Sequence, residues 1–191
     1  MNKPLLLFVG KSASGKTTIA NKLCEQYNKK QVESYTTRQP RYENEIGHKF
    51  ISKEEFKKLP ELAAYTYYNG NDYGTTFEQL KECDIYVIDV PGVETLLKNY
   101  NKINRAILIF YFDSPVPTRI DRMKKRKDSD SDILSRLYHD EQTNWFLDLK
   151  KCVEENNILS VCLISIDAKK EINEIINLIT YWTEFYVGEI L

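Results

Sequence analysis

Residues Leu5 to Thr17 read Leu-Leu-Leu-Phe-Val-Gly-Lys-Ser-Ala-Ser-Gly-Lys-Thr, and this stretch says most about the architecture of the chain. Its apolar half, Leu5 to Val9, is typical of a strand buried on both faces. Its second half, Gly10 to Thr17, fits the pattern G-x-x-x-x-G-K-[ST], in which a glycine-rich loop joins a strand to a helix. Apolar residues then recur at helical spacing, which predicts a helix over Thr17 to Tyr27.

Each residue type in this loop suits the binding of a nucleoside triphosphate, ATP or a close relative. Its glycines let backbone N–H groups turn inward as an anion nest, and the helix start directs its positive dipole end to the same point. We expect Lys16 to reach the β- and γ-phosphates and the Thr17 hydroxyl to ligate Mg²⁺. The predicted ATP-binding residues are Gly10, Lys11, Ser12, Ala13, Ser14, Gly15, Lys16, Thr17 and Thr18.

The rest of the chain alternates apolar runs with segments of helical spacing. Strands are predicted over Ile85 to Val90, Ala106 to Phe112 and Ile158 to Ile166. Helices are predicted over Val93 to Tyr100, Val116 to Lys125, Ile133 to Glu155 and Lys169 to Val187. Such alternation favours a parallel sheet flanked by helices. The polar, Tyr-rich stretch Val32 to Gly74 differs in texture and predicts a small inserted lobe, with a capping box at Ser52 and Glu55.

Composition excludes several classes of protein. The 191 residues suit one α/β domain, and 42% hydrophobic residues are enough for a globular core. A net charge of -1 gives no support to a nucleic-acid or membrane partner. Four scattered cysteines and two histidines predict no zinc site. Because no apolar run reaches about 18 residues and no secretory leader is found, we expect a soluble cytoplasmic protein.

Two later segments carry further phosphate chemistry. Ser34 to Arg41 reads Ser-Tyr-Thr-Thr-Arg-Gln-Pro-Arg, so that two arginines three residues apart can form a bidentate clamp for a second phosphate. Asn71 to Thr76 adds a tyrosine hydroxyl and threonines on a glycine turn. In this order after the phosphate loop, and with the strand that ends at Asp89, these segments resemble the guanylate kinase family, whose pattern is S-x-T-T-R-x-P-R followed by G-x-x-Y-G-[ST].

The resemblance also changes the interpretation of a basic run in the sequence. Arg119 to Lys127 holds six basic residues in nine, and such a run is usually a solvated helix face. Here Arg122 to Arg126, followed by Asp130, Ile133 and Arg136, resembles the arginine-bearing lid of the family. The resemblance therefore implies that arginines of this region face phosphate.

The resemblance implies an α/β fold of the P-loop NTPase type, in a single domain over residues 1–191. Its parts would be a core (1–31 and 75–191), an inserted acceptor-binding lobe (about 32–74) and a lid (about 118–136). The implied activity is ATP-dependent phosphorylation of a nucleoside monophosphate, most readily GMP or dGMP, with Mg²⁺, by a monomer or homodimer. The implied catalytic residues are Lys16, Arg38, Arg122, Arg126 and Arg136. The implied acceptor-binding residues are Ser34, Arg38, Arg41, Tyr73, Thr75 and Asp89. The implied metal-binding residues are Thr17 and, through water, Asp89.

Several positions depart from the family pattern, and three of them bear on the acceptor. Asn44, with Glu45 next to it, stands where the family has a glutamate, and Phe50 stands where it has a tyrosine of the phosphate clamp. Ala64 stands where the family has the carboxylate that reads guanine. Loss of that carboxylate would leave the donors of guanine unpaired and lower the preference for it.

Three other functions stay open at this point. The first is a kinase of this type that acts on another nucleotide or on a sugar phosphate, which Ala64 and Phe50 favour. The second is a non-catalytic binding module, which the intact Lys16 and Thr17 disfavour. The third is a GTP-binding switch, suggested by the D-x-x-G pattern of Asp89 to Gly92, although no N-K-x-D signature follows it.

Overall fold

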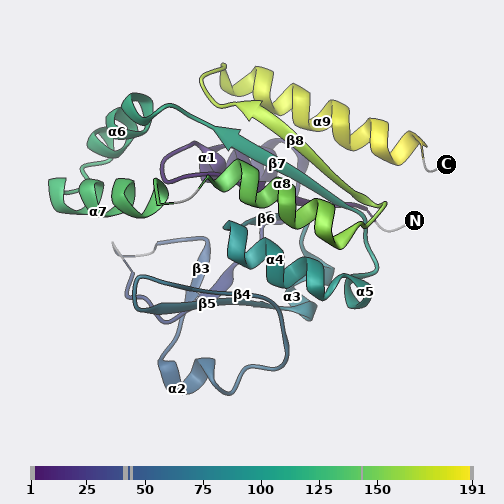
Figure 1. Ribbon diagram of the computed structural model, residues 1–191, viewed down its shortest axis with the longest axis horizontal. Coiled ribbons are helices and arrows are strands. Elements are labelled where there is room, and N and C mark those ends of the chain that lie inside the picture. Colours follow the sequence, from purple (N-terminus) through teal and green to yellow (C-terminus); the bar gives the residue numbers. More distant parts are fainter. Residues whose placement is uncertain (1–2, 41–42, 44, 143, 190–191) are drawn as a thin grey trace.

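The predicted first strand lies inside a four-stranded parallel sheet of the order β6-β1-β7-β8 (Figure 1). This computed structural model describes residues 3–40, 43, 45–142 and 144–189. The strands are β1 (Leu5–Val9), β6 (Ile85–Val87), β7 (Ile107–Asp113) and β8 (Val161–Asp167). Every residue of β1 is buried, as the unbroken apolar run predicts.

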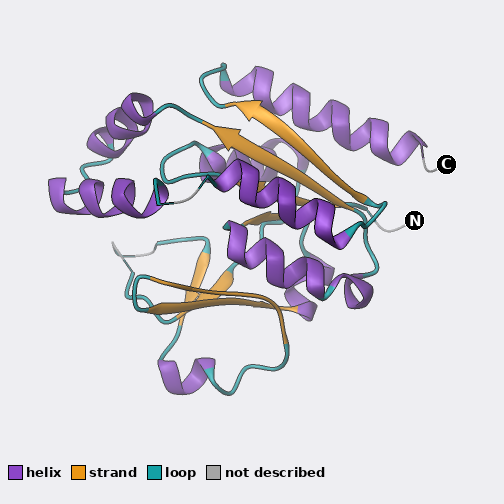
Figure 2. Cartoon of the chain, viewed as in Figure 1, coloured by secondary structure: helices purple, strands orange, loops and turns teal. Residues whose placement is uncertain are grey.

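Helices cover both faces of this sheet (Figure 2). On one face, α1 (Lys16–Tyr27) and α9 (Ile172–Glu189) pack against β-strand residues such as Phe8 and Phe110. On the other face, Leu7 and Ile109 belong to a core shared with α3 (Phe77–Glu82), α4 (Val90–Lys98), α5 (Tyr100–Ile103) and α8 (Trp145–Asn156). The α/β architecture and the parallel sheet are therefore confirmed.

A second sheet of the order β3-β2-β5-β4 forms the inserted lobe. Its strands are β2 (Ser34–Thr36), β3 (His48–Phe50), β4 (Leu62–Tyr68) and β5 (Asn71–Thr76), and α2 (Lys53–Phe56) accompanies them. The predicted capping box of Ser52 and Glu55 starts α2. The lobe is joined to α4, because the Thr95 hydroxyl donates to the Tyr65 carbonyl at 3.1 Å.

Two helices extend beyond the sheet near the phosphate loop (Figure 1). They are α6 (Val116–Lys125), whose predicted bounds are confirmed, and α7 (Asp130–Asp140). Within the described part of the chain, no helix combines the length and the apolar character needed to cross a membrane.

Two predicted elements were wrong in their bounds. The strand predicted over 85–90 ends at Val87, because Asp89 caps α4 by accepting from the Gly92 N–H at 2.9 Å, with proline in the first turn. The helix predicted over 133–155 is two helices, since α7 ends before Glu141 and Asn144 starts α8 by accepting from the Leu147 N–H at 3.2 Å.

The other bounds differ less. The helix predicted over 93–100 begins three residues earlier, as α4, and is followed by the short α5. At the C-terminal end, β8 begins at Val161 rather than 158, and α9 at Ile172 rather than 169.

Candidate active site

The phosphate loop joins β1 to α1 as a tight turn with unusual backbone angles. Gly10 has φ 151°, and a Cβ atom there would lie 2.6 Å from the Phe112 carbonyl oxygen on β7. Ala13 has φ 59°, and Gly15, the residue before α1, has φ 103°. Glycine is needed at the first position because the loop lies directly against the neighbouring strand.

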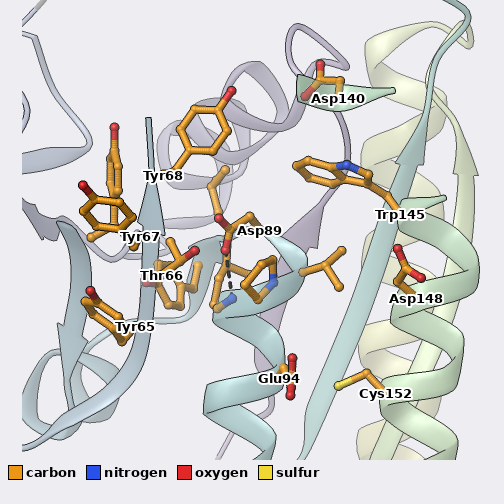
Figure 3. Close-up of a pocket in the computed structure, with 18 of the residues that line it drawn as sticks. Tyr65, Thr66, Tyr67, Tyr68, Asp89, Glu94, Asp140, Trp145, Asp148 and Cys152 are labelled. Carbon is orange, nitrogen blue, oxygen red and sulfur yellow. Dashed lines mark hydrogen bonds between the residues drawn. The ribbon is translucent and has the colours of Figure 1, made fainter. Parts of the chain in front are cut away.

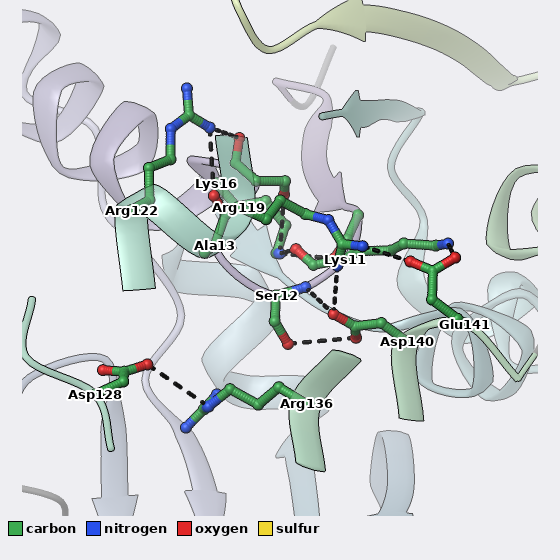
Figure 4. Close-up of polar contacts among 12 residues, drawn as sticks. Lys11, Ser12, Ala13, Lys16, Arg119, Arg122, Asp128, Arg136, Asp140 and Glu141 are labelled. Atoms are coloured by element: carbon green, nitrogen blue, oxygen red, sulfur yellow. Dashed lines mark hydrogen bonds and ion pairs between the residues drawn. The ribbon is translucent and has the colours of Figure 1, made fainter. Parts of the chain in front are cut away.

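Lys16 is folded against this loop (Figure 4). Its ammonium donates to the Gly10 carbonyl at 2.6 Å, to the Lys11 carbonyl at 2.8 Å and to the Ser14 hydroxyl at 3.2 Å. Burial lowers the pKa of Lys16 to about 8, while the carboxylate of Asp140 acts in the opposite direction. The ammonium thus lies where a phosphate of ATP could replace the loop carbonyls as its partner.

The three arginines predicted to belong to a lid have different partners. Arg122 donates to the Ser14 carbonyl at 3.0 Å and to the Ala168 carbonyl at 2.7 Å, so it binds the outside of the phosphate loop. Arg126 donates to Asp128 at 2.8 Å, and Arg136 lies 3.8 Å from the same carboxylate. Of these three arginines, Arg122 alone donates a hydrogen bond to the phosphate loop within the described part of the chain.

Two cavities meet at Lys16. The smaller, of about 480 Å³, is lined by the loop from Ala13 to Thr18 and by Arg122 and Arg126. The larger, of about 800 Å³, is lined by Lys16 and Arg136 and by many residues of the lobe. Lys16 is thus placed to contact ligands in both cavities.

The larger cavity lies between the lobe and two helices of the core (Figure 3). One wall is Tyr65 to Tyr68 of β4, and the opposite wall includes Trp145 and Asp148 of α8. Three of the predicted acceptor-binding residues, Ser34, Tyr73 and Asp89, line the same cavity. Tyrosine rings and hydroxyl groups therefore dominate the wall that the lobe provides.

Asp89 lies on the core side of this cavity and already has hydrogen-bond donors. Burial raises the pKa of its carboxyl, while the Gly92 N–H and the Thr66 hydroxyl, as donors, lower it. Because it is the cap of α4, this carboxylate is fixed in place at the carboxyl end of β6.

Arg38 is bound by Glu45, which lies one residue after the position where the family pattern has a glutamate. Its guanidinium donates to the two oxygens of Glu45 at 2.9 and 3.0 Å, and it lies 5.2 Å from the centre of the Phe50 ring. The side chains of Arg38 and Glu45 are 14% and 5% exposed, so the pair is largely desolvated. Arg41 and Asn44 lie outside the described residues.

Two positions of the predicted base-binding region lie behind the cavity wall. Thr75 is fully buried on β5, and its hydroxyl lies within reach of the Tyr86 side chain. Ala64 is fully buried on β4 and contributes to the core. The cavity wall instead includes Thr66, two residues along the same strand and on the same face.

Four residues, His48, Arg119, Asp140 and Glu141, had no predicted role, although the structure brings them to the site. His48 lines the larger cavity, and its Nδ1 lies 2.9 Å from the Ser34 hydroxyl, whereas Phe50 lies under Arg38. Arg119, Asp140 and Glu141 form a buried or half-buried cluster beside the phosphate loop. Helical spacing could have placed Arg119 on one face with Arg122, but no sequence signal points to the other three.

The chain matches the family model described as "Guanylate kinase" over residues 1–162. It is 30% identical to the guanylate kinase of Geobacter metallireducens over 144 residues, which cover 69% of this chain and 70% of that protein. It is 34% identical to the guanylate kinase of Clostridium tetani over 139 residues, which cover 66% of this chain and 63% of that protein.

Solved structures show the same fold at low identity. The crystal structure of guanylate kinase from Anaplasma phagocytophilum aligns with a TM-score of 0.57 and 18% identity, covering 96% of this chain and 86% of that one. The structure of a sugar kinase from Janibacter aligns with a TM-score of 0.52 and 16% identity, covering 95% of each chain. At such identities the likeness concerns the fold alone.

Proposed function

The chain belongs to the guanylate kinase family, and on that basis we propose that it transfers the γ-phosphoryl group of ATP to a nucleoside monophosphate, with GMP or dGMP as the first acceptor. The products are ADP and the nucleoside diphosphate. Membership of the family supports the phosphorylation of a nucleoside monophosphate. The choice of base is the finer part of the proposal.

The observation that carries the proposal is the position of Lys16 in the wall of both cavities. A kinase of this type must hold a donor and an acceptor on either side of the transferring phosphoryl group. The smaller cavity contains the phosphate loop and two lid arginines, which suits the phosphates of ATP. The larger cavity contains Ser34 and Tyr73, which suits the acceptor.

The roles we propose follow from this arrangement. Lys16 leaves the carbonyls of its own loop for the phosphates, while Arg122, Arg126 and Arg136 neutralise the charge that develops during transfer. Arg38, together with Arg41 and Tyr73, holds the phosphate of the acceptor. Ser34, Thr75 and Asp89 lie near its base. Residues 32–74 act as the acceptor lobe and residues 118–136 as the lid, whose closure onto the core 1–31 and 75–191 excludes water.

Mg²⁺ fits the chemistry of this site. Mg²⁺ is usually bound by one or two protein ligands, substrate phosphates and several waters rather than by an all-protein cage. The Thr17 residue is exposed at the start of α1, and no group of three or more potential metal-ligating side chains occurs among the described residues. We propose that Thr17 holds the ion directly and Asp89 through water, and that the ion neutralises phosphate charge.

A second acceptor class is favoured by one observation. The position implied for the carboxylate that reads guanine holds the fully buried methyl group of Ala64. The polar groups that the lobe contributes to the cavity wall are instead hydroxyls and the imidazole of His48. A different nucleotide or a sugar phosphate is therefore the alternative acceptor.

An assay of ADP release across a panel of monophosphates tests the proposal. With Mg-ATP and the wild-type chain, we expect ADP release that depends on an added nucleoside monophosphate and that is lost in Lys16→Ala. If release responds only to a sugar phosphate, the alternative holds. If the wild type neither binds ATP with Mg²⁺ nor responds to any acceptor, a non-catalytic binding module replaces both.

A further inference from the structure

A buried ion pair joins the two helices beside the phosphate loop (Figure 4). Arg119 of α6 and Asp140 at the end of α7 are 1% and 2% exposed, and Nη1 of the arginine lies 2.7 Å from Oδ2 of the aspartate. The other terminal nitrogen of Arg119 donates to Glu141. Both terminal nitrogens of the arginine are therefore committed to the two consecutive carboxylates.

The same aspartate also binds the phosphate loop. Asp140 Oδ2 accepts from the backbone N–H of Ser12 at 2.8 Å, and Oδ1 accepts from the Ser12 hydroxyl at 3.3 Å. Next to it, Glu141 accepts from the Lys11 ammonium at 2.7 Å. Two consecutive carboxylates thus hold two consecutive residues of the loop, 128 and 130 positions apart in sequence.

Packing alone does not account for this pair. Removing two charges from water costs free energy, and a well-packed apolar pair of similar volume is often as stable or more stable. An apolar pair, however, cannot accept the Ser12 N–H. A hydrogen bond from a backbone N–H to a carboxylate is among the stronger ones, and its loss leaves a donor unpaired in a half-buried loop.

A carboxylate beside a triphosphate site needs a neighbouring positive charge. Without one, Asp140 would repel the phosphates that the loop is built to bind. Arg119 supplies that charge, and its Nη1 donates to the same oxygen that accepts from the Ser12 N–H.

We propose that Asp140 and Arg119 are positioning residues for the phosphate loop: Asp140 holds the Ser12 N–H and so the loop in its ATP-binding shape, and Arg119 orients and neutralises Asp140. This proposal rests on the proposed function only for its predicted effect on KM. The tie between α7 and the loop exists without any acceptor.

A double replacement separates positioning from packing. Arg119→Leu leaves the buried carboxylate of Asp140 without its ion-pair partner, and Asp140→Ala leaves the buried Arg119 with only the half-exposed Glu141. Both single variants are therefore expected to lower the melting temperature and to weaken ATP binding. The double variant has no buried charge and is expected to recover most of the melting temperature. It still lacks the acceptor for Ser12, so its dissociation constant for ATP stays about tenfold or more above that of the wild type.

Kinetics and a matched control sharpen the test. In the double variant KM for ATP is expected to rise about tenfold, while KM for the acceptor stays within about twofold. Glu154→Ala removes one partner of an exposed ion pair on α8 and is expected to change none of these values. Recovery of both the melting temperature and ATP affinity in the double variant would reduce the pair to a packing role and overturn the proposal.

Amide hydrogen exchange keeps the test decisive if the variants fail to fold. In the wild type without nucleotide, the Ser12 amide is expected to exchange slowly, as a bonded donor does, and in a folded double variant it is expected to exchange much faster. If the Ser12 amide of the wild type exchanges as fast as amides in exposed loops do, the proposal is overturned. If the wild type proves inactive on every acceptor, the proposed function fails, while ATP affinity and exchange still decide this inference.

Discussion

Ala64 of β4 lies directly opposite Thr75 of β5, and both side chains are fully buried. Neither residue is among those that line the larger cavity, and a methyl group stands where the family resemblance implies a carboxylate. The methyl group of Ala64 cannot accept a hydrogen bond from the amino group of a guanine base. The relationship therefore bears directly on which acceptor the enzyme prefers.

We expect the enzyme to discriminate poorly between GMP and IMP. The two differ by the exocyclic amino group, and a site without a carboxylate opposite that group gains no charge-assisted bond from it. The ratio of kcat/KM for the two acceptors is expected to lie within about tenfold. A preference for GMP of a hundredfold or more would show that another group reads the amino nitrogen.

The bidentate pair of Arg38 and Glu45 predicts a selective effect on the acceptor. Lysine cannot reproduce two parallel hydrogen bonds, so Arg38→Lys is expected to raise KM for the acceptor about tenfold or more. KM for ATP is expected to stay within about twofold. Lys49→Ala, in the neighbouring strand of the same lobe, serves as the control, and an equal effect of both substitutions would contradict the assigned role.

The lowered pKa of Lys16 predicts a pH limit for ATP binding. An exposed lysine keeps its proton to above pH 10, but Lys16 loses it near pH 8 in the free enzyme. The dissociation constant for ATP is therefore expected to rise by up to about tenfold per pH unit above that value. Calorimetric titration between pH 7 and about 9.5 measures this, with Lys16→Met as a variant whose affinity is expected to stay flat.

The same titration has a consequence for stability with a defined sign. Above pH 8 the unfolded chain binds more protons at this lysine than the folded chain does. The free energy of unfolding of the wild type is thus expected to rise with pH relative to Lys16→Met from about pH 8 towards 10. If the difference in free energy of unfolding between the wild type and Lys16→Met does not change with pH, Lys16 has an ordinary pKa in the folded protein.

Gly10 predicts how closely the phosphate loop must approach β7. A Cβ atom in Gly10→Ala would lie 2.6 Å from the Phe112 carbonyl oxygen, so the loop or the strand has to move. We expect a loss of about 1–3 kcal/mol in the free energy of unfolding together with weaker ATP binding. Gly188→Ala in α9 meets no atom within 4 Å and is expected to leave both unchanged. Denaturant titration that finds the two variants equally stable would contradict this account of the loop.

The sequence predicted the elements that carry a local signal. Fully apolar strands, the phosphate-loop pattern and the helix of Val116 to Lys125 need no information from distant residues, and the structure has each of them. The end of β6 was misjudged because Ile88 continues the apolar run, although Asp89 and Pro91 are signals of a helix start.

The environment of the phosphate loop could not be predicted in the same way. Asp140 is an ordinary polar residue near the end of a helix until the fold brings it to Ser12. Glu45, one residue after the expected position, supplies the carboxylate that binds Arg38. Only the path of the folded loop shows that this residue reaches the arginine. His48 lines the larger cavity from β3, the strand that also holds Phe50, and no pattern in the sequence assigned it a role.

The transfer of labelled phosphate from ATP tests the central claim most directly. The wild-type chain is incubated with Mg²⁺, ATP labelled in the γ-phosphate and GMP or dGMP, and the nucleotides are then separated. The account predicts label in the nucleoside diphosphate at the rate at which ADP forms, and none with Lys16→Ala. Label recovered only as inorganic phosphate, or no loss of label from ATP with any nucleoside monophosphate, would contradict it.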